Sequence, residues 1–164
     1  MAVVFDASVL IDLFNPRLDG DKRIKLDVLV ETLSKQRTRI LVPTPAFTEL
    51  LVHAGKARES YFLEFSSNSA FQLESFDPRA AMECALLLSE SWTKAEQHKV
   101  THTKVKFDWQ IVAIAASRGA SAIYSDDTDV VRAAARRQIP VHSTDSLQIP
   151  ASAKQRPIPF DPEN

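Results

Sequence analysis

The stretch AVVFDASVLI at residues 2–11 decides the fold. Ala2 to Phe5 is a short apolar run rich in β-branched residues, which predicts a buried strand. The run stops at Asp6, and Ser8 is placed to cap a helix that begins at Val9. A strand that leads directly into a helix is typical of the first unit of an α/β domain.

The same alternation continues along the chain. Further strands are expected at Arg39 to Val42, Phe71 to Phe76, Ala120 to Ser125 and Ile139 to His142. Helices are expected at Asp21 to Leu33, Thr44 to Ala54, Ala57 to Phe65, Ala80 to Ala95, Asp108 to Ala116 and Thr128 to Arg137, with a polar loop at Lys99 to Lys106. This order predicts a three-layer α/β/α fold, in which a parallel sheet of four or five strands in the order 3-2-1-4-5 is covered by helices on both faces.

The size and composition predict one globular domain. The chain has 164 residues, of which 45% are hydrophobic and 25% charged, as is usual for a folded domain. From Ser143 onward the sequence is polar and proline-bearing, with no helical or strand period. We therefore expect the domain to span residues 1–145 and a polar surface extension to span residues 146–164.

The cysteine count and the apolar runs indicate a cytoplasmic location. Cys84 is the only cysteine, which excludes an intrachain disulfide and a cysteine-based zinc site, and suits a reducing cytosol. We expect no ordinary secretory signal, because Asp6 interrupts the first apolar run. No later run approaches the roughly 20 residues that a bilayer span requires.

The formal net charge of −1 does not by itself favour a nucleic-acid partner. The sum nevertheless conceals a segregation of charge. Basic residues gather at Lys22, Arg23 and Lys25, at Lys35, Arg37 and Arg39, at Lys94, Lys99, Lys104 and Lys106, and at Arg132, Arg136 and Arg137. Solvated faces explain most such clusters, so charge alone gives little evidence here.

Four acidic residues occupy positions that this topology brings together. Asp6 ends the first strand, Glu49 lies early in the helix after the second strand, Asp108 begins the helix before the fourth strand, and Asp127 follows that strand. If the fourth strand lies beside the first, the strand order reverses between them and all four acids face one crevice. Asp126 and Asp129 lie close by in sequence.

Grouped carboxylates raise one another's pKa, so a bare cluster is unfavourable and a hard divalent cation reverses that balance. Such a site is suited to phosphodiester hydrolysis, because the metal charge offsets the negative charge that develops on the phosphate. Each acid also has a structural interpretation, as a helix cap for Asp108, a turn for 126–129 and an exposed helix face for Glu49. Asp6 is the hardest to explain structurally, since an acid at a sheet centre is costly unless it is paired or coordinated.

These residues resemble the PIN-domain family. VFDASVLI at 4–11 is similar to its opening Asp-x-Ser motif, FTEL at 47–50 to its glutamate segment, FDWQIVA at 107–113 to its third acid, and SDDTD at 125–129 to its Thr-x-Asp-x-Asp stretch. The similarity runs from the first residues to the fifth strand. It departs from the family where Ser125 stands for the commoner Thr, where Asp126 beside Asp127 makes the fourth acid ambiguous, and where Val130 replaces an aromatic residue.

The resemblance implies a ribonuclease that uses Mg²⁺ or Mn²⁺ to hydrolyse RNA. It implies Asp6, Glu49, Asp108 and Asp127 as the catalytic acids, with the metal held by Asp6, Asp108, Asp127 and Asp129. Ser8 and Ser125 would position water or phosphate. A compact chain of this length resembles the VapC toxins of type II toxin-antitoxin pairs, which implies a VapB-like antitoxin and a homodimer.

Other functions remain in consideration. A PIN-like nuclease outside a toxin-antitoxin system, acting in RNA processing or on DNA, would share the same chemistry, and a non-catalytic PIN-like module would keep only the fold. A haloacid-dehalogenase-like phosphatase needs a second acid two residues after the first, where this chain has Ser8. His98 and His102 are four residues apart, but a structural zinc site needs four ligands, so we expect none there.

Overall fold

A computed structural model describes residues 1–91 and 107–151 of the chain. The five strands form one parallel sheet in the order β3-β2-β1-β4-β5. They are β1 (Ala2–Phe5), β2 (Arg39–Pro43), β3 (Phe71–Glu74), β4 (Ile123–Tyr124) and β5 (Val141–His142). The predicted strand order and the predicted parallel direction are both confirmed.

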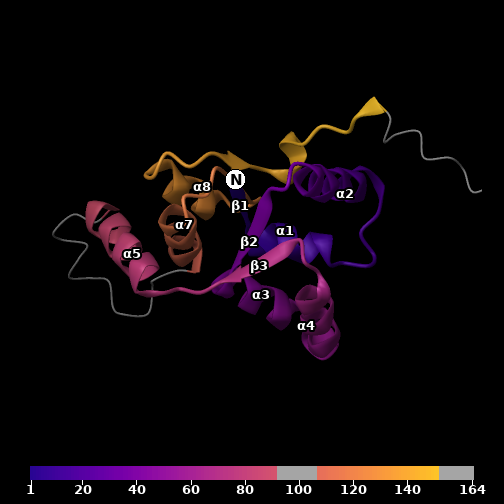
Figure 1. Cartoon of the computed structure of the whole chain (residues 1–164), viewed down its shortest axis with the longest axis horizontal. Coiled ribbons are helices and arrows are strands. Elements are labelled where there is room, and N and C mark those ends of the chain that lie inside the picture. Colours follow the sequence, from indigo (N-terminus) through magenta and orange to yellow (C-terminus); the bar gives the residue numbers. More distant parts are fainter. Residues whose placement is uncertain (92–106, 152–164) are drawn as a thin grey trace, which may run out of the picture.

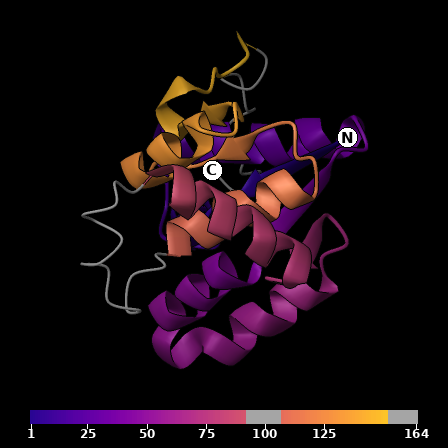
Figure 2. The ribbon, with the colours of Figure 1, turned by 90° about the vertical axis from the view of Figure 1, so that its left-hand side faces the viewer.

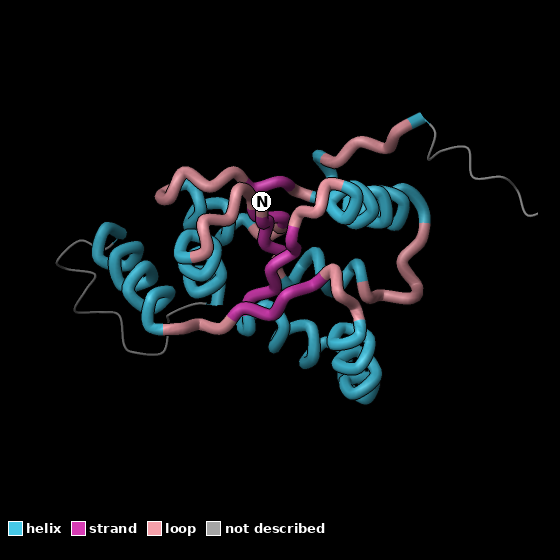
Figure 3. The backbone as a smooth tube through the Cα atoms, in the orientation of Figure 1, coloured by secondary structure: helices cyan, strands magenta, loops and turns pink. Residues whose placement is uncertain are grey.

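Helices cover both faces of the sheet, which runs through the centre of the molecule in Figure 3. On one side lie α1 (Ala7–Leu13), α2 (Gly20–Lys35), α3 (Thr44–Ala54) and α4 (Arg58–Ser67), with the short 3-10 turn η1 (Gly55–Ala57) between the last two. On the other lie α5 (Pro78–Ser91), α7 (Phe107–Ser117) and α8 (Thr128–Ala135). Figure 1 shows the two groups on either side of the strands, and Figure 2 looks onto the second group. The division follows from right-handed crossovers, because the chain moves outward from β1 to β3 and then returns toward β5.

The core lies on both faces of the central strands. Every residue of β1 is buried, as are four of the five residues of β2, which is expected where helices cover a parallel sheet on both sides. Residues 111–115 of α7 are completely buried because this helix contacts both α5 and α8. On the opposite side, Phe65 stacks on Phe71 of β3 with ring centroids 5.4 Å apart. These contacts hold the carboxyl ends of β1 and β4 in place, where the acidic residues lie.

The structure corrects one local prediction at the start of α1. Asp6, not Ser8, caps this helix, with its side chain accepting a hydrogen bond from the Ala7 amide. Both residues are favourable cap types two positions apart. The strand geometry of β1 ends at Phe5, so the helix begins at Ala7 and Asp6 takes the cap position.

The fourth and fifth strands are shorter than predicted. The fourth and fifth strands are two residues each, although backbone bonds from Ser121 to Ala2 and from Val4 to Ala122 already join the preceding residues to β1. Gly119, with φ of +62°, follows the end of α7 as predicted. The end of the helix predicted at 80–95, the polar loop at 99–106 and the histidine pair at 98 and 102 lie outside the described residues.

The start of the predicted tail is ordered against the domain. Residues 144–146 form the 3-10 turn η2 (Thr144–Ser146), Thr144 is buried, and Leu147 packs against the core. The polar extension expected at residues 146–164 thus begins within η2, and the structure describes its first residues as far as 151. None of the helices within the described ranges is long and apolar enough to cross a membrane.

Candidate active site

Asp6 lies at the carboxyl end of β1, in the middle of the sheet, and is only 4% exposed. Its Oδ1 accepts from the Ala7 amide, and its Oδ2 accepts from Ser125 Oγ at 2.6 Å and from Ser8 Oγ at 3.1 Å. Burial raises the pKa of Asp6 above its ordinary value, although the three hydrogen bonds act in the opposite direction. The carboxylate is thus held rigidly in a place where its charge is poorly solvated.

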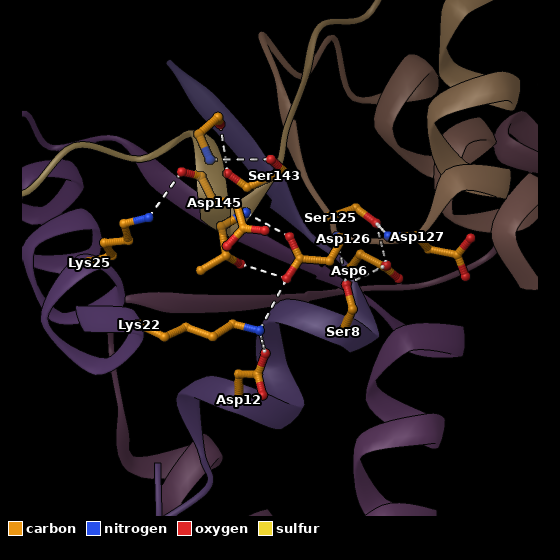
Figure 4. Close-up of polar contacts among 12 residues, drawn as sticks. Asp6, Ser8, Asp12, Lys22, Lys25, Ser125, Asp126, Asp127, Ser143 and Asp145 are labelled. Atoms are coloured by element: carbon orange, nitrogen blue, oxygen red, sulfur yellow. Dashed lines mark hydrogen bonds and ion pairs between the residues drawn. The ribbon is translucent and has the colours of Figure 1, made fainter. Parts of the chain in front are cut away.

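The two predicted positioning serines connect Asp6 to the loop between β4 and α8. Ser8 Oγ accepts from the Asp126 amide at 3.0 Å, and Ser125 Oγ accepts from the Asp127 amide at 3.0 Å. Each hydroxyl therefore donates to Asp6 and accepts from the loop backbone, as shown in Figure 4. In the structure these serines position Asp6. Their expected role in holding water or phosphate stays a prediction.

Glu49, in the middle of α3, shares its electrostatic environment with the other predicted acids. Burial raises the pKa of Glu49, and the negative charges of Asp6, Asp108 and Asp127 raise it further. The charge of Asp127 also raises the pKa of Asp6. The fold therefore gathers, around one site, four acids that are contributed by four separate segments of the chain.

Asp108 and Asp127 lie at the starts of two helices. Asp108 is in the first turn of α7 and is half-buried. Asp127 caps α8, where its Oδ1 accepts from the Asp129 amide at 2.7 Å. Asp127 thus has a structural role as a helix cap, yet a cap uses one carboxylate oxygen and leaves the other available to a ligand.

Asp126 and Asp127 have different surroundings. Asp126 points toward Lys22, whereas Asp127 points away from it (Figure 4). Burial alone would raise the pKa of Asp126, but hydrogen bonds from Thr144 and from Lys22 outweigh it and lower the pKa. Asp126 is therefore already neutralised by protein groups, and Asp127 is the acid that adds to the charge around Asp6 and Glu49.

Asp129, the fifth predicted acid, is engaged on the helix surface. Its Oδ1 lies 2.9 Å from Arg132 Nη1, three residues along α8. A carboxylate that shares a cation with a neighbouring arginine is a weaker metal ligand than an unpaired one. The metal-binding role expected for Asp129 stays a prediction.

The acids fit a hard divalent cation by their chemistry. Asp6, Glu49, Asp108 and Asp127 offer only carboxylate oxygens, the ligands that Mg²⁺ and Mn²⁺ prefer. Within residues 1–91 and 107–151, no three such side chains stand close enough together to surround an ion by themselves. The fit therefore rests on the chemistry of the carboxylate ligands, and Mg²⁺ usually keeps several waters and takes only one or two carboxylates directly.

Two contributors to the site were not singled out from the sequence. Lys22 was noted only as part of a basic cluster, and Thr144 lies in the polar stretch from Ser143 onward, where no motif was recognised. The one available signal was the Asp126–Asp127 doublet, since two adjacent carboxylates repel each other and a cation or hydrogen-bond donor beside either one relieves that repulsion.

Comparison with known proteins agrees with this geometry. The sequence model of the PIN domain family matches residues 3–136 of this chain. The fold is similar to that in the crystal structure of VapBC2 from Rickettsia felis bound to a DNA fragment from their promoter, with 15% identity and a TM-score of 0.62 over 87% of this chain and 98% of that one. The fold is also similar to that in the crystal structure of DNA-bound VapBC from Salmonella typhimurium. The two chains are 15% identical, and the TM-score is 0.59 over 88% of this chain and 98% of that one. A comparison with curated protein sequences found no match.

Proposed function

The chain belongs to the PIN domain family, and from that membership we propose that it is a metal-dependent endoribonuclease, the toxin of a type II toxin-antitoxin pair. PIN domains are generally nucleases that use divalent metal ions, and the acids expected of such a nuclease are all present. The two similar crystal structures are of VapBC assemblies, which supports a VapB-like antitoxin as the partner. A reducing cytoplasm suits the lone buried thiol of Cys84.

The observation that carries the proposal is the shared charge of the four acids. Glu49 has a raised pKa because it is buried and because Asp6, Asp108 and Asp127 are near it. A fold that only needed stability would separate these charges or pair each with a base. Their grouping at the carboxyl ends of β1 and β4, where the strand order reverses, is expected of a site that binds a cation.

In the proposed site Asp6, Asp108 and Asp127 would hold Mg²⁺ or Mn²⁺, one or two of them directly and the others through water, with Asp129 as a further candidate ligand. The ion, when bound, offsets the negative charge that develops on the phosphate during hydrolysis. The chain's own residues prepare the site. Ser8 and Ser125 keep the Asp6 carboxylate in one orientation, and an acid that does not contact the ion, such as Glu49, orients water by hydrogen bonds.

The antitoxin is proposed to bind over α3 and α4. A surface for an antitoxin predicts exposed apolar side chains on the helices between β1 and β2 or on those between β2 and β3. Among the described residues, the large exposed apolar side chains of this layer lie on α3 and α4 only: Val52, Phe62 and Leu63 are each at least half exposed. A partner segment that covers them and brings a basic residue toward the acids would compete with the metal for the same charge. The homodimer implied by the family stays part of this proposal.

The substrate class is tested with matched oligonucleotides. The purified chain is incubated with one RNA and with DNA of the same sequence, in Mg²⁺, in Mn²⁺ and in excess chelator. We expect RNA to be cleaved only where metal is present. Cleavage of the DNA alone, or RNA cleavage that persists in chelator, would replace this proposal with a different nuclease. The toxin role is tested separately, by whether a small reading frame for a DNA-binding protein adjoins the gene.

A further inference from the structure

A short segment beyond the family match is bonded to the loop that carries Asp127. The PIN match ends at residue 136, whereas η2 begins at Thr144, which is 1% exposed. The Thr144 amide donates to Asp126 Oδ1 at 2.6 Å, and Thr144 Oγ1 donates to Asp126 Oδ2 at 2.8 Å. One threonine thus binds both oxygens of the Asp126 carboxylate.

Two lysines of α2 contact the loop and this segment. Lys22 Nζ lies 2.5 Å from Asp12 Oδ2 and 3.3 Å from Asp126 Oδ2, so it bridges α1 and the loop. One turn further along α2, Lys25 Nζ donates to the Asp145 carbonyl at 2.9 Å. Figure 4 shows Lys22 between the two carboxylates and Lys25 reaching the segment beside them. The loop is therefore held from α1, from α2 and from η2.

The backbone of the same loop holds the residues around Asp6. The Asp126 amide donates to Ser8 Oγ, the Asp127 amide donates to Ser125 Oγ, and both hydroxyls donate to Asp6. The Asp126 side chain, by contrast, faces Thr144 and Lys22. Fixing this side chain consequently fixes the two amides that position the serines, and with them the orientation of Asp6 and the start of α8 at Asp127.

We propose that Lys22, Asp126 and Thr144 form a latch that positions residues 125–127, so that Asp126 acts as a positioning residue while Asp127 serves as the fourth acid. The role of the latch in cleavage rests on the proposed function. The contacts of Asp126 favour this assignment, because its charge is paired with that of Lys22 and its side chain faces Thr144. Asp127, by contrast, shares the electrostatic environment of Asp6 and Glu49.

The test uses the full chain and separates the latch from the metal site. Thr144→Val keeps the shape and the backbone amide but removes the hydroxyl donor, and Asp126→Ala removes the acceptor for both Thr144 bonds. Lys22→Gln, at a partly exposed position, serves where a buried substitution fails to fold. Asp145→Asn is the matched control: it removes one negative charge from the same segment, and only the backbone carbonyl of Asp145 is used by the latch.

Thr144→Val and Asp126→Ala are each expected to lower kcat about tenfold, as for residues that orient a site's ligands. KM and the Mg²⁺ concentration for half-maximal cleavage should stay near the wild-type values. The double variant should show little more than the larger single effect, because both changes break the same contact. Asp145→Asn should cleave as the wild type does.

A second measurement requires no activity. Backbone ¹⁵N order parameters of the metal-free protein at residues 125–127 should fall toward about 0.6, the range of a flexible loop, in Thr144→Val. The latch is overturned if kcat and order parameters both stay at the wild-type level, or if Asp126→Asn raises the Mg²⁺ requirement as much as Asp127→Asn does. If the wild type cleaved no RNA, the proposed function would fail, whereas loss of order at 125–127 would still support the latch.

Discussion

Ser125 Oγ donates to Asp6 Oδ2 across 2.6 Å, joining the ends of two adjacent parallel strands, β4 and β1, at the centre of the sheet. The serine is completely buried, and it also accepts from the Asp127 amide. Because Ser125 and Ser8 both donate to Asp6, the chain itself holds this carboxylate in one orientation. Preorganisation of this kind reduces the ordering that metal binding would otherwise require.

The first prediction concerns Asp6→Asn. The amide keeps the shape of the side chain and remains a good helix cap, so α1 should still form. Cleavage of RNA should fall about 100-fold or more, as expected when a metal site loses a charged ligand. The rate is measured in Mg²⁺ and in Mn²⁺ beside melting curves, with Asp108→Asn as a second site variant and Asp21→Asn, exposed on α2, as the charge control.

Stability and activity should separate in these variants. Added metal should raise the melting temperature of the wild type, because a ligand that binds only the folded state stabilises it. Asp6→Asn should gain less from the same metal. If Asp6→Asn unfolded while the wild type showed no response to metal, Asp6 would be a structural residue and the metal-dependent mechanism would be wrong.

The second prediction uses the raised pKa of Glu49. A carboxyl whose pKa is higher in the folded than in the unfolded state contributes stability that is fully present below the unfolded value and is lost as the pH rises through the folded value. Glu49→Gln removes this pH-dependent loss of stability, because glutamine does not ionise. In chelator, the variant should be more stable than the wild type near neutral pH, and the difference should shrink as the pH falls toward the ordinary glutamate value of about 4.5.

Urea unfolding at a series of pH values measures this difference directly. Adding Mg²⁺ at neutral pH should reverse the order of stability, since the wild type alone then gains the full effect of the ion. A stability difference that is the same at every pH would mean that Glu49 is not held near the other acids.

The third prediction concerns the ion pair between Arg118 and Glu74, which should affect stability but not RNA cleavage. Arg118 Nε lies 2.6 Å from Glu74 Oε2, and Glu74 is a buried carboxylate that also accepts from Gln72. Arg118→Met should leave Glu74 unpaired and lower the free energy of unfolding by about 2 kcal/mol, less than for a fully buried pair because Arg118 is partly exposed to solvent.

Thermal melting should show a shift of about 5 °C for that loss, while the cleavage rate per folded molecule should be unchanged. Glu74→Gln combined with Arg118→Met should recover part of the stability, because no buried charge then remains. A loss of cleavage in the folded Arg118→Met protein would place this ion pair in the site rather than in the scaffold.

The sheet and the gathering of the acids could be predicted because both depend on short-range patterns. The buried run before Asp6 identifies β1, and an acid at the end of a central parallel strand faces the crevice where the strand order reverses. The lengths of β4 and β5 were less predictable. Ala120 to Ser125 is apolar and bonds to β1 from Ser121 onward, yet only two of its residues complete a regular ladder on both sides.

The support around the site depends on contacts that leave no pattern in the sequence. Lys22 contacts Asp126 from more than one hundred residues away in the sequence, and Thr144 contacts it across a separation of 18 residues that includes α8 and β5. Neither position belongs to a hydrophobic period or a motif. Likewise, Asp6 and Ser8 are equally suitable caps by type, and only the register of β1 decides between them.

The last prediction concerns the partner surface on α3 and α4. Leu63 is 67% exposed, in the layer opposite α5. A partner that buries it would gain apolar contact, so Leu63→Glu should weaken binding of the antitoxin about tenfold or more by placing a charge in that contact. Met82→Glu is the matched control, because Met82 is 64% exposed on α5, in the other layer. The dissociation constant is measured by calorimetry with the protein encoded beside the gene.

RNA cleavage by Leu63→Glu alone should be normal, since the substitution lies outside the acidic site, but the antitoxin should inhibit it less. Weakening by Met82→Glu and not by Leu63→Glu would move the partner to the α5 layer, and inhibition that persists without binding over α3 and α4 would rule out this surface.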